Sequence, residues 1–185
     1  MSKARIDLLR WLGLMWLSLW FVPSQADLPA LTHELTAIAE STPAPKLRLL
    51  SMDDEMIDIG SLKGKVVVVN FWATWCPPCR QEMPSLEALY QETKARGVVV
   101  LAINIGEDFD TVLPFLDSLE PPPSFPILLD SDSSTLSDWR VRGLPTTFVV
   151  APDGNLAFEA VGGREFSHPD LIKQLLSLLG PVNRP

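Results

Sequence analysis

The chain has 185 residues, of which 46% are hydrophobic, and its formal net charge is -8 at pH 7. This length and apolar content suit one well-filled core and are too small for two ordinary domains, so we expect a single domain with an N-terminal appendage. No basic stretch could release counterions from a polyanion, which excludes nucleic acid, or an anionic membrane surface, as the main partner.

Residues 1–26 have the features of a secretory signal peptide. Three basic residues precede an apolar stretch of 12 residues, Trp11–Val22, and Ser24, Gln25 and Ala26 supply the small residues that signal peptidase reads. A bilayer-spanning helix needs about 20 apolar residues, so an uncleaved anchor is the less favoured alternative. We expect cleavage after Ala26 and a mature chain that does not span the membrane.

The segment 27–45 is predicted to contain a short helix and a linker. The apolar residues of Ala30–Glu40 fall on one face of a helix, and the prolines of Pro43–Pro45 end it. The domain itself, residues 46–185, then opens with two short strands, Leu47–Leu50 and Met56–Ile59, around an acidic turn. We expect this hairpin to cover an edge of the main sheet.

Two cysteines, Cys76 and Cys79, stand where a β-branched run, Val66–Val69, gives way to a helical pattern. If Cys76 is the helix N-cap, Pro77 and Pro78 take the first helical positions, where a missing N–H has no cost. The Cys79 N–H then faces the Cys76 sulfur, and the helix dipole favours a thiolate there. One turn brings the two sulfurs within bonding distance, with Cys76 at the exposed helix tip.

Redox chemistry is the favoured role for this pair. A disulfide that closes so short a loop removes little unfolded-state entropy, so a structural staple is disfavoured. A structural zinc site needs four ligands, and the only histidines, His33 and His168, lie in segments remote from the cysteines. No metal and no other cofactor is therefore predicted. Carriage of a soft metal such as Cu(I) stays an alternative, although no Met or His stands beside the pair.

Strands and helices alternate after the motif, which predicts an α/β fold with a mixed sheet and helices on both faces. Ser167 and Asp170 are placed to form a capping box for the last helix. The predicted elements are a helix to Arg96, a strand Val98–Ile105, a helix Phe109–Leu119, a strand Pro126–Leu129, strands Thr146–Ala151 and Leu156–Val161, and a helix Leu171–Leu179.

The run from Asn70 to Cys79, together with Pro84 and the distant segment Gly143–Thr147, resembles the thioredoxin superfamily. In particular it resembles the TlpA/ResA/CcmG (DsbE) group of bacterial envelope thiol:disulfide oxidoreductases, over roughly residues 43–179. The resemblance implies a thioredoxin-like α/β fold: a central mixed β-sheet flanked by helices, with an N-terminal β-hairpin and a central βα insertion.

The resemblance also implies the chemistry of the site. Cys76 attacks a partner disulfide and Cys79 resolves the mixed disulfide, so the two cysteines form a disulfide when oxidised. Pro145 is expected to be cis and to lie against the pair, which would leave the Leu144 backbone free to pair with an extended substrate segment. Glu82, one helical turn beyond Cys79, is expected near the thiols; a solvated helix carboxylate is the alternative.

Three further expectations concern the surroundings of the thiols. Asn70 stands where thioredoxin has a buried Asp, so Glu82 or a water must carry the proton. Trp72 is expected in the core, because it lies on a buried strand. Trp75, with Pro77 and Pro78, is a candidate for contact with the substrate.

These residues together predict a periplasmic disulfide reductant. The resemblance implies two partners: a disulfide-bearing envelope protein, of the kind met in cytochrome c maturation or copper-site assembly, and a membrane electron donor of the DsbD/CcdA type. A disulfide oxidant is an alternative. A peroxidase is disfavoured, because Ala73 stands where a Thr is expected three residues before the reactive Cys.

Overall fold

The computed structural model describes residues 30–180, so the predicted signal peptide lies outside the described residues. In chain order the elements are β1 (Thr36–Pro43), β2 (Arg48–Leu50), β3 (Met56–Asp58), η1 (Ile59–Leu62), β4 (Val66–Trp72), α1 (Pro77–Thr93), η2 (Lys94–Arg96), β5 (Val98–Ile105), α2 (Phe109–Asp117), β6 (Ile127–Asp130), α3 (Thr135–Asp138), β7 (Thr146–Val150), β8 (Asn155–Val161) and α4 (Pro169–Ser177).

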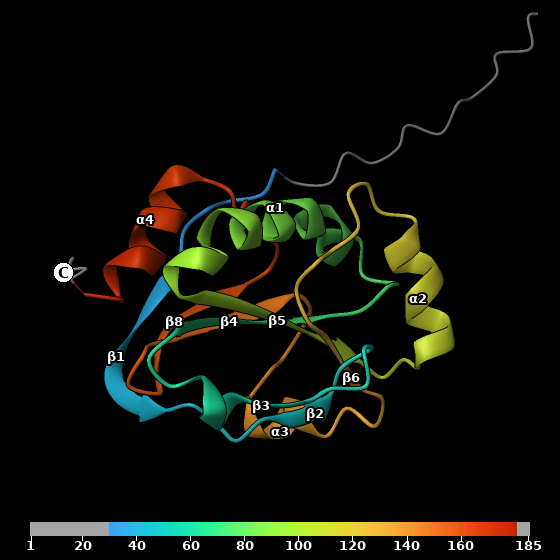
Figure 1. Cartoon of the computed structure of the whole chain (residues 1–185), viewed down its shortest axis with the longest axis horizontal. Helices are drawn as coiled ribbons and strands as arrows, with labels where there is room; N and C mark the ends of the chain where they lie inside the picture. Colours follow the sequence, from blue (N-terminus) through green and yellow to red (C-terminus); the bar gives the residue numbers. More distant parts are fainter. Residues whose placement is uncertain (1–29, 181–185) are drawn as a thin grey trace, which may run out of the picture.

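A six-stranded mixed sheet with the order β1-β8-β7-β4-β5-β6 forms the centre of the molecule (Figure 1). β4 pairs in parallel with β5 and antiparallel with β7. Every residue of β4 is buried, because the sheet is covered on both faces and β-branched side chains pack well on each of them. The fold is therefore the thioredoxin-like α/β fold that the sequence predicts.

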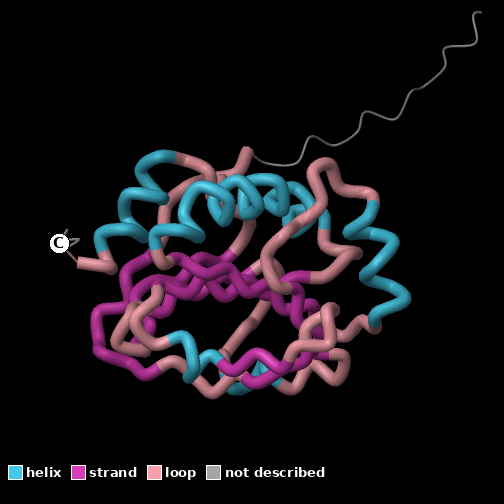
Figure 2. Tube along the Cα trace, in the orientation of Figure 1, coloured by secondary structure: helices cyan, strands magenta, loops and turns pink. Residues whose placement is uncertain are grey.

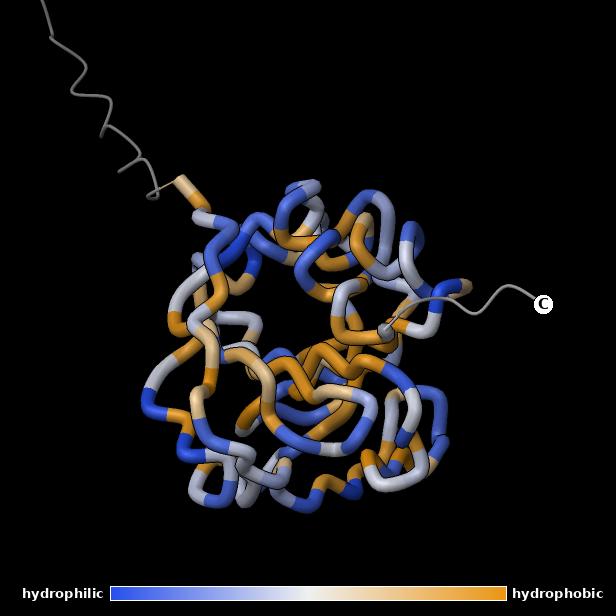
Figure 3. Tube along the Cα trace, turned by 90° about the vertical axis from the view of Figure 1, so that its left-hand side faces the viewer, coloured by the Kyte–Doolittle hydropathy of each residue, from blue (hydrophilic) through white to orange (hydrophobic). Residues whose placement is uncertain are grey.

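Two layers cover the sheet. α1 and α4 lie over one face, while α3 and the β2-β3 hairpin lie under the other, as the tube coloured by secondary structure also shows (Figure 2). The core consists of two apolar clusters, one on each face of the sheet, and alternate residues of β4 contribute to each. Val66 and Val68 pack in the cluster under the helices, and Val67 and Val69 pack in the cluster on the hairpin side. Hydrophobic segments accordingly gather in the interior of the molecule (Figure 3).

The β2-β3 hairpin lies against an edge of the main sheet, as predicted. Ser51 forms an antiparallel bridge with Leu128 of β6, and the Met52 N–H donates to the Ile127 carbonyl at 2.9 Å. Because β6 is the last strand of the sheet, these bonds occupy backbone groups that would otherwise be an open edge.

The prediction of a short helix over Ala30–Glu40 is wrong. This region contains β1, which pairs antiparallel with β8 and has a register irregularity between Ala37 and Thr42. The apolar residues that suggested a helical face are also compatible with a half-exposed edge strand, and the backbone groups of β8 need a partner. The main sheet thus begins before residue 46, inside the segment 27–45 that the sequence predicts to be a short helix and a linker.

The predicted capping box of the last helix is also wrong. His168 is the N-cap of α4, and its Nδ1 accepts the Asp170 N–H at 3.2 Å. The Ser167 hydroxyl instead donates to Glu165. Within residues 30–180 no helix has the length and apolar character needed to cross a bilayer.

Candidate active site

Cys76 and Cys79 form a disulfide at the N-terminus of α1. Cys76 is the N-cap, Pro77 and Pro78 take the first two helical positions, and the Cys79 N–H donates to the Cys76 Sγ at 3.4 Å. The first turn therefore has the arrangement predicted from the sequence. Its prolines leave the Cys76 sulfur with a single backbone donor from this turn, that of Cys79.

The exposure predicted for Cys76 is wrong. Cys76 is only 3% exposed and Cys79 is 0% exposed, and both belong to the apolar cluster between the helices and the sheet. In the disulfide the Cys76 sulfur is bonded to a buried partner, which draws it into this cluster. The order still holds, since Cys76 is the outer of the two thiols.

Glu82 lies fully buried on α1, one turn beyond Cys79, which contradicts the alternative of a solvated carboxylate. The Asn70 amide donates to its Oε1 at 2.7 Å, and the Arg164 N–H donates to its Oε2 at 2.9 Å. The same Asn70 amide donates to the Thr147 hydroxyl at 2.9 Å. Glu82 thus joins α1, β4 and the loop before α4.

Burial raises the pKa of Glu82 from 4.5 to about 8, although the hydrogen bonds from Arg164 and Asn70 and the Arg164 charge act in the opposite direction. Desolvation has the larger effect, because the hydration free energy that a carboxylate loses on burial exceeds the stabilisation from two hydrogen bonds of neutral donors. Glu82 is therefore mostly protonated at neutral pH. A carboxyl group that titrates near pH 8 can exchange a proton with a thiol.

A second carboxylate, Glu107, holds the turn that precedes the cysteines. It accepts the Thr74 N–H at 2.8 Å and also the Thr74 hydroxyl. The amide of Asn104, at the end of β5, donates to the same carboxylate at 2.7 Å. Because the Cys76 N–H donates back to the Ala73 carbonyl at 3.2 Å, fixing Thr74 fixes the start of α1.

The predicted substrate-contact residues come from three segments that the fold brings together. The Leu144-Pro145 peptide bond is cis, as predicted. The Pro145 carbonyl accepts the Gly162 N–H at 2.8 Å, and a Cβ added at Gly163 would lie 3.3 Å from the Pro78 carbonyl oxygen. The loop after β8 therefore lies against the Cys-Pro-Pro-Cys turn. A Cβ at Gly163 would be tight against Pro78 and would clash with the Leu31 side chain, 2.6 Å away.

The two tryptophans separate as predicted. Trp72 is fully buried and packs near Phe115 of α2, whereas Trp75 is 68% exposed beside Cys76. A groove of about 520 Å³, lined in part by Pro77, Arg80 and Phe115, lies between α1 and α2 next to the thiols. An exposed indole and an adjoining groove suit contact with a polypeptide.

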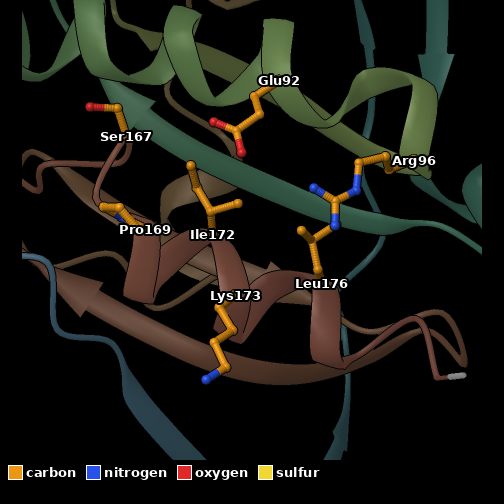
Figure 4. A pocket seen from close by; sticks show the side chains of 7 residues that line it. All are labelled: Glu92, Arg96, Ser167, Pro169, Ile172, Lys173 and Leu176. Atoms are coloured by element: carbon orange, nitrogen blue, oxygen red, sulfur yellow. The ribbon is translucent and has the colours of Figure 1, made fainter.

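Another recess, of about 290 Å³, lies between the far end of α1 and α4 (Figure 4). Glu92 and Arg96 line it from the α1 side, and Lys173 and Leu176 line it from α4. With about 1.5 Å of rise per helical residue, Glu92 lies roughly 20 Å along α1 from the cysteines. This recess is therefore not part of the redox site.

Sequence reasoning missed Glu107, Arg164 and the Gly162-Gly163 pair. Glu107 accepts the backbone N–H of Thr74, and Arg164 donates its own backbone N–H to Glu82. Both bonds join segments that lie far apart in the sequence, so no local pattern indicates them. The paired glycines were the one available signal, because adjacent glycines often mark a close approach of backbones.

A Cys-x-x-Cys disulfide at the N-terminus of α1, on a thioredoxin-like sheet, defines a thiol-disulfide oxidoreductase. A solved structure from Chlorobium tepidum, assigned as the thiol:disulfide interchange protein DsbE, is similar to this chain with a TM-score of 0.70 and 29% identity, covering 78% of this chain and 100% of that one.

Curated sequences agree with this class. The family model described as "AhpC/TSA family" matches residues 41–159. The thiol-disulfide oxidoreductase ResA of Bacillus subtilis is 35% identical over 78% of each chain, and that of Halalkalibacterium halodurans is 35% identical over 72% of this chain and 73% of its own. The chain belongs to the AhpC/TSA family and is a thiol-disulfide oxidoreductase of the ResA/DsbE type.

Proposed function

We propose that the chain is a periplasmic reductant of disulfides in partner proteins. The observation that carries this direction of electron flow is the sparse support for a Cys76 thiolate. The first turn of α1 offers its sulfur only the Cys79 N–H, at 3.4 Å, because Pro77 and Pro78 have no N–H to give. A weakly stabilised thiolate makes the dithiol less favourable relative to the disulfide, and such a pair gives up its electrons more readily.

The reaction proceeds by two thiol–disulfide exchanges. The Cys76 thiolate attacks one sulfur of the partner disulfide, which forms a mixed disulfide and releases the first partner thiolate. The Cys79 thiolate then attacks the Cys76 sulfur, which forms the Cys76–Cys79 disulfide and releases the second partner thiolate. The partner gains two electrons and this chain loses two.

Glu82 supplies the proton relay for the second exchange. The Cys79 thiol must lose a proton before it attacks, and Glu82 lies one turn away on the same helix. The ionised form of Glu82, which is the minor form at pH 7, accepts this proton, and the pKa of about 8 puts Glu82 near a free thiol. The buried Asn70 Oδ1 has no hydrogen-bond partner among the described residues, so it can accept from the protonated Glu82 if the amide turns over.

The partner binds across Trp75, Pro77, Pro78 and the Leu144-Pro145 segment. The Leu144 backbone has no hydrogen-bond partner within residues 30–180, so its N–H and carbonyl are open to an extended strand. The exposed Trp75 indole would cover the partner's cysteine while the mixed disulfide lasts. The relatives are thiol-disulfide oxidoreductases, which supports a disulfide-bearing protein as substrate.

Export by a cleaved signal peptide over residues 1–26 places this chemistry in the periplasm, with a mature chain that begins at Asp27. Mass spectrometry of the envelope protein tests the start site, and a full-length species extracted only by detergent would contradict it. A reductant in an oxidising compartment must be recharged, which implies a membrane electron donor of the DsbD/CcdA type.

Steady-state thiol trapping tests the direction of electron flow. We expect Cys76 and Cys79 to be mainly reduced in cells that contain such a donor, and oxidised in cells that lack it. A pair that stays oxidised with the donor present, or a purified oxidised protein that readily gives its disulfide to a reduced unfolded substrate, would make the chain an oxidant. Partners captured by a Cys79→Ser variant would identify the substrate, whether it serves cytochrome c maturation or copper-site assembly.

A further inference from the structure

Both histidines of the chain meet, and neither is among the residues assigned to the redox chemistry. Their imidazole rings, in His33 and His168, stack with centroids 3.6 Å apart and planes 8° from parallel. His33 lies in the segment before β1, and His168 is the N-cap of α4. Figure 1 shows this blue segment passing beside the red helix.

Backbone bonds around His33 set its position. Thr32 forms a parallel bridge with Arg164, and the Thr32 carbonyl accepts the Glu165 N–H at 2.6 Å. On the other side of His33, the Glu34 carbonyl accepts the Arg164 Nε at 2.7 Å. The segment is thus tied to the loop that leads into α4, so the fold itself places the two rings together.

We infer that His33, His168 and Asp170 form a binding site for a divalent transition-metal ion of the zinc type. Each offers one ligand atom, and these atoms all lie within 4.8 Å of one another. The His168 Nδ1 and the Asp170 Oδ2 are 3.9 Å apart. Two imidazole nitrogens and a carboxylate oxygen are a donor set that Zn²⁺ accepts, with water in the remaining position.

The ion requires a small rearrangement that the surroundings permit. Zinc bonds of about 2.0–2.2 Å require the donor atoms to close in by roughly 1 Å. The His33 ring must also turn out of the stack to aim a nitrogen at the ion, and no hydrogen bond within residues 30–180 restrains that ring. A cavity of about 260 Å³, lined by His33, Glu34 and Asp170 among others, gives it room.

Nearby charges and dipoles both oppose and favour a cation between His33, His168 and Asp170. The positive end of the α4 dipole disfavours a cation, and the ion takes the Nδ1 lone pair that now accepts the Asp170 N–H. Asp170 and Glu34 both line the same cavity, and their negative charges offset this effect. A bound ion would tie the segment before β1 to α4 by coordinate bonds, in addition to the present stack.

Calorimetric titration of the oxidised protein with Zn²⁺ tests the site, because the disulfide keeps both thiols from binding the metal. We expect one Zn²⁺ per chain with a dissociation constant in the micromolar range. His33→Asn, His168→Asn and Asp170→Asn should each weaken binding at least tenfold. Asn is itself a favoured N-cap, so the His168 variant keeps the start of α4. Asp110→Asn, which removes the first-turn acid of α2, is the matched control and should bind as the parent does.

The imidazole NMR signals give an independent readout, since the chain has only two histidines. Zn²⁺ should shift the signals of both rings together, in proportion to the bound fraction. The site is refuted if binding is no tighter than millimolar, if the His33 variant binds as well as the parent, or if Zn²⁺ moves one ring and leaves the other unchanged.

Discussion

Replacing Glu82 by Gln should change how the stability of the oxidised protein depends on pH. Gln has nearly the shape of a protonated Glu and cannot ionise, so the variant keeps the packing while it removes the titration. Its carbonyl can accept the Arg164 N–H, and its amide can donate to the Asn70 Oδ1, which has no other partner among the described residues. The loss of native contacts should therefore be small.

The magnitude follows from the two pKa values of Glu82. The pKa rises from 4.5 to about 8 on folding, so the folded state binds the proton more tightly than the unfolded state. At about 1.36 kcal/mol per pKa unit, ionising Glu82 costs the fold roughly 5 kcal/mol in full. The unfolding free energy therefore keeps its full value below pH 4.5, where Glu82 is protonated in both states, and decreases as the pH rises towards 8. About 4 kcal/mol of it falls between pH 5 and pH 8.5.

Urea unfolding of the parent and of Glu82→Gln at pH 5 and pH 8.5 measures this loss. We expect the parent to lose about 4 kcal/mol more unfolding free energy than the variant between these two pH values. Glu92→Gln, an exposed position on the same helix, is the control and should follow the parent. Parallel pH profiles for the parent and Glu82→Gln would refute the reasoning, because Glu82 would then titrate alike in both states.

Three further predictions concern the chemistry of the site. Cys76→Ser should abolish disulfide reduction, Cys79→Ser should accumulate mixed disulfides, and alkylation should label the outer Cys76 faster; faster labelling of Cys79 would reverse the roles. Glu107→Gln replaces a carboxylate that accepts three hydrogen bonds, so we expect the unfolding free energy to fall by about 1–3 kcal/mol. Attack of Cys76 on a disulfide should also be slower; urea unfolding and thiol-exchange kinetics measure the two effects. Trp75→Ala should leave stability within about 0.5 kcal/mol and slow reduction of a protein substrate more than of a small disulfide; equal slowing would argue against partner contact.

The buried strands could be predicted closely from the sequence, whereas the edge strand could not. β5 has the predicted bounds, Val98–Ile105, and β4 begins at the predicted Val66 and continues past Val69 to Trp72, because continuous apolar runs allow few alternatives. β1 has only one half-buried residue, Ile38, and the rest of it is exposed. Its pairing depends on the backbone of β8, which lies far along the chain, so the local pattern carried no information about it.

The site divides in the same way. The cysteines and the cis Pro145 are set by short motifs, and these predictions are confirmed as geometry. The burial of Cys76 and Glu82 depends on which distant segments pack around α1. The spacing of residues near the motif gives no information about those segments. The His33–His168 stack is a further case, because two single histidines in distant segments give no motif.

The position of Glu82 supports a functional rather than a structural reason for it. A buried apolar residue there would avoid a cost of roughly 5 kcal/mol at alkaline pH, which is comparable with the whole stability of many domains. Residues that lower stability are tolerated mainly where the chemistry needs them. Here the carboxyl lies one turn beyond Cys79 and is held by Asn70 and Arg164, with a pKa close to that of a thiol. The free energy that the fold gives up at Glu82 therefore supports the role proposed for this carboxyl group, proton exchange with the resolving cysteine.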